Sequence, residues 1–392
     1  MVSATGGFLS KGDLRRPESW VDKSDSQMFF VNMDATLPDV FARRLQQARA
    51  MQGLSLRALE TAMHGFVSHN ALAKYERGDM LPGSDVLIAL SEALAQPADF
   101  FFRPFKIGVS QVRFRKKARL PVSRQKAVKE LAMDYVERYR EAEELVGDVR
   151  TYQAPLPDRP LTDIAGADCM AAKLREVWQL GHDPLPNVFE LMESKGIKVL
   201  ELPDNDRDFD GLSAETDAGP VVVIAAHLNN NLPRKRMTEA HELGHIVLKL
   251  DPAMDGKTEE KVVAAFAGAF LLPADTFTAA FGHGRQRFTV AELVELKGHF
   301  GVSIMAIMRR ALSLGLISES TYKSFCVLTS SWGWRSKGEP GDDRYAGCET
   351  DGRFRQLVRR AVAEEIITLS KGAALLGEPM SRVRHDMEQV IG

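Results

Sequence analysis

Between residues 34 and 104 the chain is a series of short helical segments with tight joints, which limits this region to a small all-α bundle. The segment over residues 38–53 carries apolar side chains at helical spacing and stops at a glycine. Three more segments begin at Ser55, Ser68 and Ser84, residues that favour the helix N-cap position. Helices this short are marginal alone, so they are expected to pack on one another.

The second and third segments match a helix-turn-helix unit, in which a supporting helix and a tight turn precede a helix that enters the DNA major groove. The third segment carries polar side chains at its N-terminal end and one turn on, at Ser68, His69, Asn70 and Lys74. Asn can read adenine, and the other three can contact bases or phosphates. Double-stranded DNA, an operator site, is therefore the predicted partner, although the pattern alone equally fits a bundle that binds protein.

Packing inside the bundle is predicted from the spacing of its apolar residues. The first segment turns its apolar face to the core and leaves its polar residues mostly on other faces, namely Arg43, Arg44, Gln47 and Arg49. The following segments are expected to supply the core residues Leu59, Ala62, Leu72 and Leu87. We also expect an ion pair between Arg57 and Glu76.

Residues 105–160 are predicted to be a basic linker and a connecting helix. No acidic residue interrupts the chain from Arg103 to Lys129, where ten side chains are basic. This run could follow DNA phosphates, or it could be a solvated linker. An amphipathic helix over residues 126–148 and a proline-containing linker follow.

The sequence pattern of the remaining chain predicts an α+β domain over residues 161–315 and a helical C-terminal region over residues 316–392. Three short apolar runs read as strands, surrounded by helical patterns, at residues 197–202, 210–215 and 220–226. In the C-terminal region we expect a loop at residues 330–347 and two helices, at residues 354–366 and 370–377.

Composition places the chain among ordinary globular proteins. At 392 residues it needs two or more domains, and its formal net charge of −2 leaves DNA binding to a local basic surface. The three cysteines are too widely spaced for a disulfide framework or a cysteine zinc site. No stretch resembles a signal peptide or a membrane span. We expect a cytoplasmic protein with no membrane partner and a flexible tail at residues 1–33.

The stretch TEAHELGHIVL, residues 238–248, has the pattern of a metal-binding helix. His241 and His245 stand four residues apart and therefore share one helix face, where neutral imidazole suits Zn2+. Glu242 between them can act as general base, accepting a proton from water and passing it to a leaving amine. The third ligand is expected from the next helix, where both Glu259 and Glu260 are available. The alternative is a surface helix with two uncoordinated histidines.

The bundle resembles the Cro/CI-type helix-turn-helix of the XRE regulator family over residues 38–102. Its most specific piece is KYERGDMLP. The segments KRMTEAHELGHIVL and EEKVVAAFAGAFLLP resemble the ImmA/IrrE family of zinc metallopeptidases, with related sequence over residues 165–318. The resemblance implies a zincin-like α+β fold and assigns the third zinc ligand to Glu260.

The chain departs from the ImmA/IrrE pattern on the second helix. Val263 and Ala264 stand where Ala and Asn or Asp are usual, which would remove a polar partner from a ligand histidine. The first segment keeps the set His241, Glu242 and His245. Peptidases of this family tend to cleave one specific repressor, so the resemblance implies a specific protein substrate.

These features predict a DNA-binding transcriptional regulator with a fused zinc metallopeptidase domain that cleaves a repressor or the chain itself. We expect a homodimer, because two half-sites suit a two-fold protein. One alternative is a regulator whose zinc domain is a non-catalytic sensor or interaction module, or an antitoxin-like repressor. Another is a stand-alone processing peptidase whose bundle binds a protein substrate.

Overall fold

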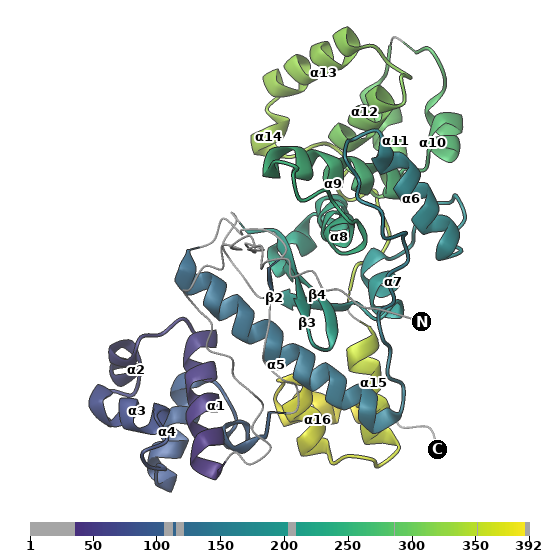
Figure 1. The fold of residues 1–392 in the computed structure, drawn as a ribbon. Helices are drawn as coiled ribbons and strands as arrows, with labels where there is room; N and C mark the ends of the chain where they lie inside the picture. The colour runs from purple at the N-terminus through teal and green to yellow at the C-terminus, as the bar shows by residue number, and fades with distance from the viewer. Residues whose placement is uncertain are drawn as a thin grey trace, which may run out of the picture.

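The computed structural model describes most of the chain, namely residues 36–105, 113–114, 121–202, 209–285, 287–350 and 352–388. The predicted tail at residues 1–33 and most of the basic run up to residue 120 lie outside these residues. The fold agrees with the predicted class: an all-α bundle precedes an α+β domain with a small sheet, and helices form the C-terminal region (Figure 1).

The N-terminal bundle consists of α1 (Leu37–Met51), α2 (Leu56–Ala62), α3 (His69–Glu76), α4 (Ser84–Leu94) and a 3-10 helix, η1 (Ala98–Phe102). The caps predicted at Ser55 and Ser68 are confirmed, because each hydroxyl accepts a backbone N–H three residues on. The cap predicted at Ser84 is wrong: Gly83 holds that position and Ser84 is the first helical residue.

The core of this bundle contains Leu59 and Leu72 as predicted, and Leu87 packs against it half-buried. Ala62 is exposed, contrary to the prediction, and the next residue, Met63, is buried in its place. The helix α2 ends at residue 62, so helical spacing no longer decides which side chain turns inward.

Two predictions about polar and charged residues of the bundle are wrong. Glu76 pairs with Arg49 rather than Arg57, with Nη2 of Arg49 2.8 Å from a carboxylate oxygen. Arg44 and Gln47, expected on the outer faces of α1, are buried. The guanidinium of Arg44 lies 2.8 Å from the carboxylate of Glu137, on a helix outside the bundle.

That helix is α5 (Val122–Val146), and it packs on a four-stranded sheet. The strand order is β1-β3-β4-β2. Strand β2 runs parallel to β4, and the other two pairs are antiparallel. The bounds are β1 (Arg113–Phe114), β2 (Lys198–Leu202), β3 (Gly211–Thr216) and β4 (Gly219–Ala225). Strand β1 is a short edge strand within the basic run, where no strand is predicted.

Strand β4 is buried on both faces, which explains its unbroken apolar sequence. Val221 and Val223 face the core formed with α5, whereas Val222 and Ile224 face the core formed with the helices of the opposite layer. Those helices are α6 (Gly166–Val177), α7 (Val188–Ser194), α8 (Leu232–Val247) and α9 (Gly256–Leu271), and a 3-10 turn, η2 (Ala226–Asn230), leads into α8.

Further helices complete the α+β domain and the C-terminal region: α10 (Ala274–Phe281), α11 (Val290–Phe300), α12 (Ile304–Ser313), α13 (Glu319–Ser331), α14 (Trp334–Lys337), α15 (Arg353–Ala363), α16 (Leu369–Leu376) and α17 (Met380–Met387). Helices α10, α13, α14 and α17 are not predicted from the sequence. The loop expected at residues 330–347 is shorter, because α13 extends into it and α14 lies within it.

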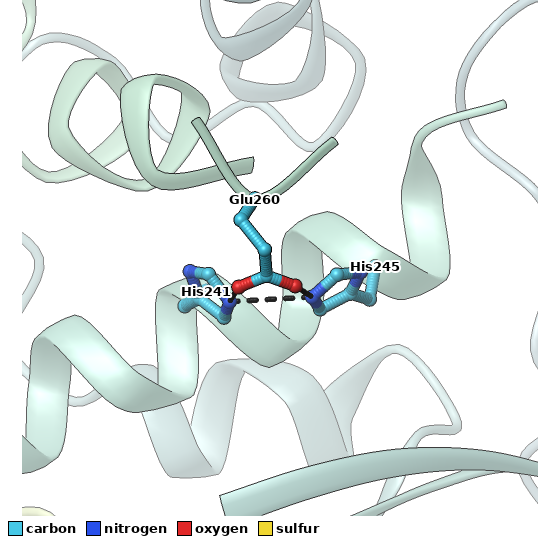
Figure 2. Close-up of side chains that lie close together, drawn as sticks. All are labelled: His241, His245 and Glu260. Atoms are coloured by element: carbon cyan, nitrogen blue, oxygen red, sulfur yellow. Dashed lines mark hydrogen bonds and ion pairs between the residues drawn. The ribbon is translucent and has the colours of Figure 1, made fainter. Parts of the chain in front are cut away.

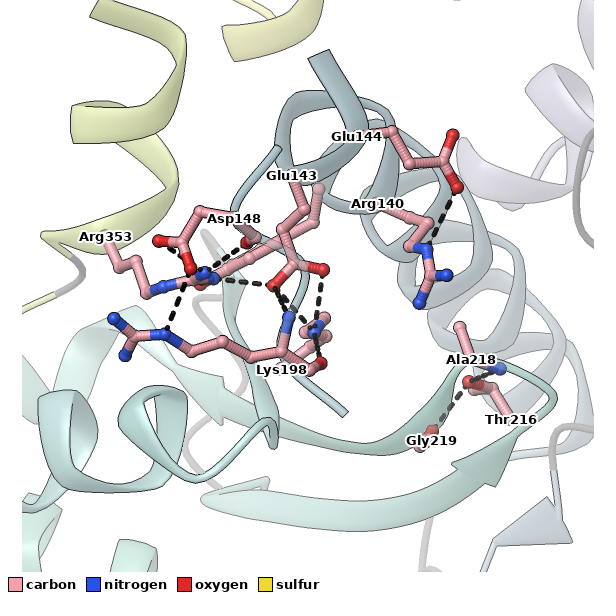
Figure 3. A network of polar contacts seen from close by, with 11 residues as sticks. Arg140, Glu143, Glu144, Asp148, Lys198, Thr216, Ala218, Gly219 and Arg353 are labelled. Carbon is pink, nitrogen blue, oxygen red and sulfur yellow. Dashed lines mark hydrogen bonds and ion pairs between the residues drawn. The ribbon is translucent and has the colours of Figure 1, made fainter. Parts of the chain in front are cut away.

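The C-terminal region returns to α5 on the face of the sheet opposite α8 (Figure 1). The ring of Phe354 stacks on Tyr139 at a centroid distance of 5.1 Å. Beside it, Arg353 and Lys198 converge on the buried carboxylate of Glu143, at 2.6 and 3.1 Å (Figure 3). Strand β2, α5 and α15 are thus joined by one buried charged cluster.

No single helix in the described part of the chain is long and apolar enough to span a membrane. The pair α9 and α10, bent by 69° at the break between them, passes by length and composition alone.

Candidate metal centre and DNA-binding helix

Helices α8 and α9 bring three side chains together (Figure 2). The Nε2 atoms of His241 and His245 are 3.2 Å apart. The two carboxylate oxygens of Glu260 lie 3.4 Å from Nε2 of His241 and 3.5 Å from Nε2 of His245. The His245 side chain is 2% exposed, whereas those of His241 and Glu260 are 21% and 30% exposed, so the cluster opens to solvent on one side.

The spacing of these atoms fits a tetrahedral metal ion. Metal–ligand bonds of about 2.0–2.1 Å at tetrahedral angles place neighbouring ligand atoms about 3.3 Å apart. The two Nε2 atoms are 3.2 Å apart, and they lie 3.4 and 3.5 Å from the two different oxygens of the Glu260 carboxylate, all close to that value. Two imidazoles and one carboxylate are also a donor set that zinc accepts, with a fourth position left for water.

Close approach of the two helices depends on Gly244. A Cβ at this position would lie 2.9 Å from Cγ1 of Val263 and 3.0 Å from Cδ1 of Phe266, both on α9. The glycine therefore lets α9 approach α8 closely enough for Glu260 to reach the histidines. The start of α9 is fixed by Asp255, whose side chain accepts the N–H groups of Lys257 and Thr258, and hydrogen bonds from Thr258 lower the pKa of Asp255.

A second carboxylate lies behind the cluster. Glu259 Oε1 is 3.7 Å from Nδ1 of His245, the ring nitrogen that faces away from His241. A carboxylate beside this nitrogen favours the tautomer that presents Nε2 to a metal ion. From the residue pattern alone, Glu259 and Glu260 are both possible third ligands, and in the structure they occupy different places around His245.

The opposite side of α8 is held by buried charges. Arg236 on α8 and Glu349 of the C-terminal region form a fully buried ion pair. The Glu349 carboxylate also accepts the N–H groups of Val188 and Phe189 at the start of α7, at 2.7 and 3.1 Å. Burial and the adjacent Glu349 raise the pKa of Glu239 well above its ordinary value. The C-terminal region therefore holds α8 in place on the side away from the histidine cluster.

Glu242 is 7% exposed and follows His241 directly on α8. Within the described residues its carboxylate makes no hydrogen bond or ion pair to another side chain. Its carboxylate is therefore not committed to another side chain among these residues.

The helix α3 presents the four residues predicted to contact DNA in different ways. Ser68, Asn70 and Lys74 are exposed, although the Ser68 hydroxyl also caps the helix. His69 is half-buried, and its Nδ1 lies 2.8 Å from Oε2 of Glu60 on α2. The side chains of Asn70 and Lys74 are thus the best placed of the four to contact DNA.

A hollow beside α3 adds residues that the sequence analysis does not single out for DNA contact. Arg57, Thr61 and His64 line it together with His69. They lie on α2 and the turn that follows, so a supporting helix contributes polar groups next to the predicted recognition helix. The spacing of residues within α3 could not reveal them.

Family models match two parts of the chain. A helix-turn-helix model matches residues 45–101, from within α1 to η1. A peptidase-family model described as the IrrE N-terminal-like domain matches residues 192–312, a range that contains the sheet strands β2 to β4 and both helices of the metal cluster. No curated protein and no solved structure gives a significant match.

Proposed function

We propose that this chain, which joins a helix-turn-helix DNA-binding domain to an IrrE N-terminal-like peptidase domain, is a transcriptional regulator that hydrolyses a peptide bond in one specific protein. The observation that carries the peptidase proposal is the cluster of donor atoms on His241, His245 and Glu260, in which the two Nε2 atoms are 3.2 Å apart and lie 3.4 and 3.5 Å from the two carboxylate oxygens. The target is either a repressor or the chain itself.

The metal centre would consist of these three side chains and one Zn2+ ion. When bound, zinc lowers the pKa of water to near neutrality and polarises the scissile carbonyl. Exposure of His241 and Glu260 leaves one side of the centre open to a substrate. Burial of His245 and the nearby Glu259 carboxylate keep the second imidazole oriented.

Glu242 is proposed as the general base. Its carboxylate accepts a proton from the attacking water and then donates that proton to the amine of the departing peptide. Its place next to His241 and its lack of a competing partner among the described side chains support this role.

A non-catalytic sensor domain is the competing proposal. Its support is the apolar pair Val263 and Ala264, which removes a usual polar partner of the ligands. The nearby Glu259 supplies a carboxylate to His245 from a different position. A carboxylate near Nδ1 of His245 can help to orient that imidazole in place of the usual polar partner, which supports the peptidase over the sensor.

The peptidase is tested with wild-type, Glu242→Gln and His241→Ala proteins. Metal content by mass spectrometry should be about one zinc per chain in wild type and Glu242→Gln, and much less in His241→Ala. Each protein is then incubated with zinc and a soluble extract of its source cells, and new N-termini are identified by labelling. Cleavage of one protein by wild type alone supports the proposal; equal cleavage by Glu242→Gln refutes the base, and zinc binding without cleavage favours the sensor.

DNA binding is proposed to use α3, with Asn70 toward base edges and Lys74 toward a phosphate. Genomic fragments retained by the wild-type protein would supply the operator for gel-shift assays. Asn70→Ala should reduce discrimination between operator and random DNA by about 1–3 kcal/mol. Sedimentation of the complex checks the proposed homodimer. Binding of all fragments with equal affinity would contradict sequence-specific regulation.

A further inference from the structure

A cavity of about 660 Å3 lies where the DNA-binding bundle, α5, β2 and the C-terminal helices meet. Its volume is within the range of small-molecule sites, about 300–1,000 Å3, and such sites often lie at domain junctions. The wall from the bundle includes Met51, Gln96 and Phe100, and the facing wall includes Phe354 and Ala374. In Figure 1 the bundle and α16 lie at one side of α5, which separates both from the α8–α9 layer.

The walls combine apolar side chains with charged ones. Leu131 of α5 packs against the core of the bundle and also against the core formed by the sheet and α15. Leu200 and Leu202 of β2 and Leu376 of α16 add aliphatic surface. A ligand here would touch the DNA-binding bundle and the C-terminal region at once.

The charged groups around the cavity almost all have an oppositely charged partner, either in the lining or just behind it. Four acidic and four basic side chains line it. Arg138 pairs with Asp134 at 2.8 Å, and Arg355 pairs with Glu378 at 2.6 Å. The remaining lining charges are also held in ion pairs, except Asp99, which is exposed.

This pairing decides the class of ligand. An ionised ligand would lose its hydration on entering the cavity, and the charges of the wall already have partners. New ion pairs would therefore not offset the free energy of desolvation. An uncharged ligand has no such cost and gains from the aliphatic and aromatic walls. We propose that the cavity is a binding site for an uncharged, mainly apolar small molecule. This site is separate from the metal centre, and the proposal does not depend on peptidase activity.

The test uses two fluorescent probes with nearly the same rings. N-phenyl-1-naphthylamine is uncharged, and 1-anilinonaphthalene-8-sulfonate carries a sulfonate. The full chain should bind the uncharged probe with saturation at about one per chain and at least about tenfold more tightly than the anionic probe. Failure of the uncharged probe to saturate, or tighter binding of the sulfonate, would overturn the proposal.

Two kinds of variant test whether the probe binds in this cavity. Ala374→Trp fills the space from α16 and should weaken the uncharged probe at least about tenfold. The matched control is Ala363→Trp, on the exposed end of α15, which should leave the affinity unchanged. Gln96→Trp fills the cavity from the bundle and replaces Ala374→Trp if circular dichroism shows that the latter does not fold.

A second apolar surface provides a further control. Trp332 is 43% exposed, and together with Val290 and Pro340 it lines an open hollow near α14. Trp332→Ser should not change probe affinity. Loss of binding in this variant, with full binding in Ala374→Trp and Gln96→Trp, would place the probe on that surface and refute the cavity site.

Discussion

Substitution of Gly244 by alanine should disturb the proposed metal centre without changing a proposed ligand. The new Cβ would lie 2.9 and 3.0 Å from two side-chain carbons of α9. Ordinary carbon contacts are about 3.5–4.0 Å, so the helices must separate by roughly 0.5–1 Å. Because Glu260 is on α9, the same movement would stretch its distances to the histidines from 3.4 and 3.5 Å to roughly 4 Å, beyond the tetrahedral edge of about 3.3 Å.

Two opposing terms act on stability in this variant. Overpacking lowers the free energy of unfolding by about 1–3 kcal/mol, whereas the higher helix propensity of alanine raises it by about 1 kcal/mol. The net change in unfolding free energy is therefore small, about 0–2 kcal/mol of destabilisation. The loss of zinc affinity should be the larger effect, roughly tenfold to a hundredfold, as for other disturbances behind metal ligands.

The assay is competition for zinc with a chromophoric chelator at neutral pH. Gly268→Ala is the matched control, because it makes the same change on α9 at a site where a Cβ meets nothing within 4 Å. It should keep wild-type zinc affinity. In the double variant Gly244→Ala/Val263→Ala the shorter side chain removes the Cγ1 contact, so part of the affinity should return. Wild-type affinity in Gly244→Ala, or strictly additive effects in the double variant, would refute the reasoning.

Three further predictions concern the DNA-binding bundle and its attachment. Arg44→Met leaves Glu137 buried without its closest partner and should lower the unfolding free energy by about 3–5 kcal/mol, measured by urea denaturation. Burial raises the pKa of Asp134, but nearby arginines including Arg138 outweigh it and hold the pKa below its ordinary 3.8. The carboxylate therefore stabilises the fold above about pH 4, and this is lost as the pH falls through the lower folded-state pKa; Asp134→Asn should destabilise the protein at neutral pH and flatten its acid dependence. Lys74→Ala should weaken DNA binding across sequences and reduce the salt slope by about 1; an unchanged slope would remove Lys74 from the phosphate contacts.

Local patterns in the sequence predicted the features that depend on neighbouring residues. The serine caps of α2 and α3 follow from residue type, and the shared face of His241 and His245 follows from four-residue spacing. The three main strands follow from short apolar runs.

Features set by distant parts of the chain could not be predicted in this way. Arg44 looks like a surface residue of α1 until α5 places Glu137 beside it. The role of Gly244 appears only when α9 is packed on α8. Glu259 and Glu260 are adjacent in sequence, and only the crossing of the two helices separates the group near Nδ1 of His245 from the group near both Nε2 atoms.

The buried charges on α5 bear on how the DNA-binding bundle is joined to the rest. Glu137 and Asp134 hold the bundle through Arg44 and Arg103, and burial raises the pKa of Glu137 despite Arg44. Further along the same helix, Glu143 holds β2 and α15 through Lys198 and Arg353. Removing one partner of such a buried pair lowers the free energy of unfolding by about 3–5 kcal/mol. The bundle is therefore packed firmly on α5 and is not joined by a flexible linker alone. A change in the packing of α5 against the sheet should therefore also disturb the ion pairs by which α5 holds the DNA-binding bundle.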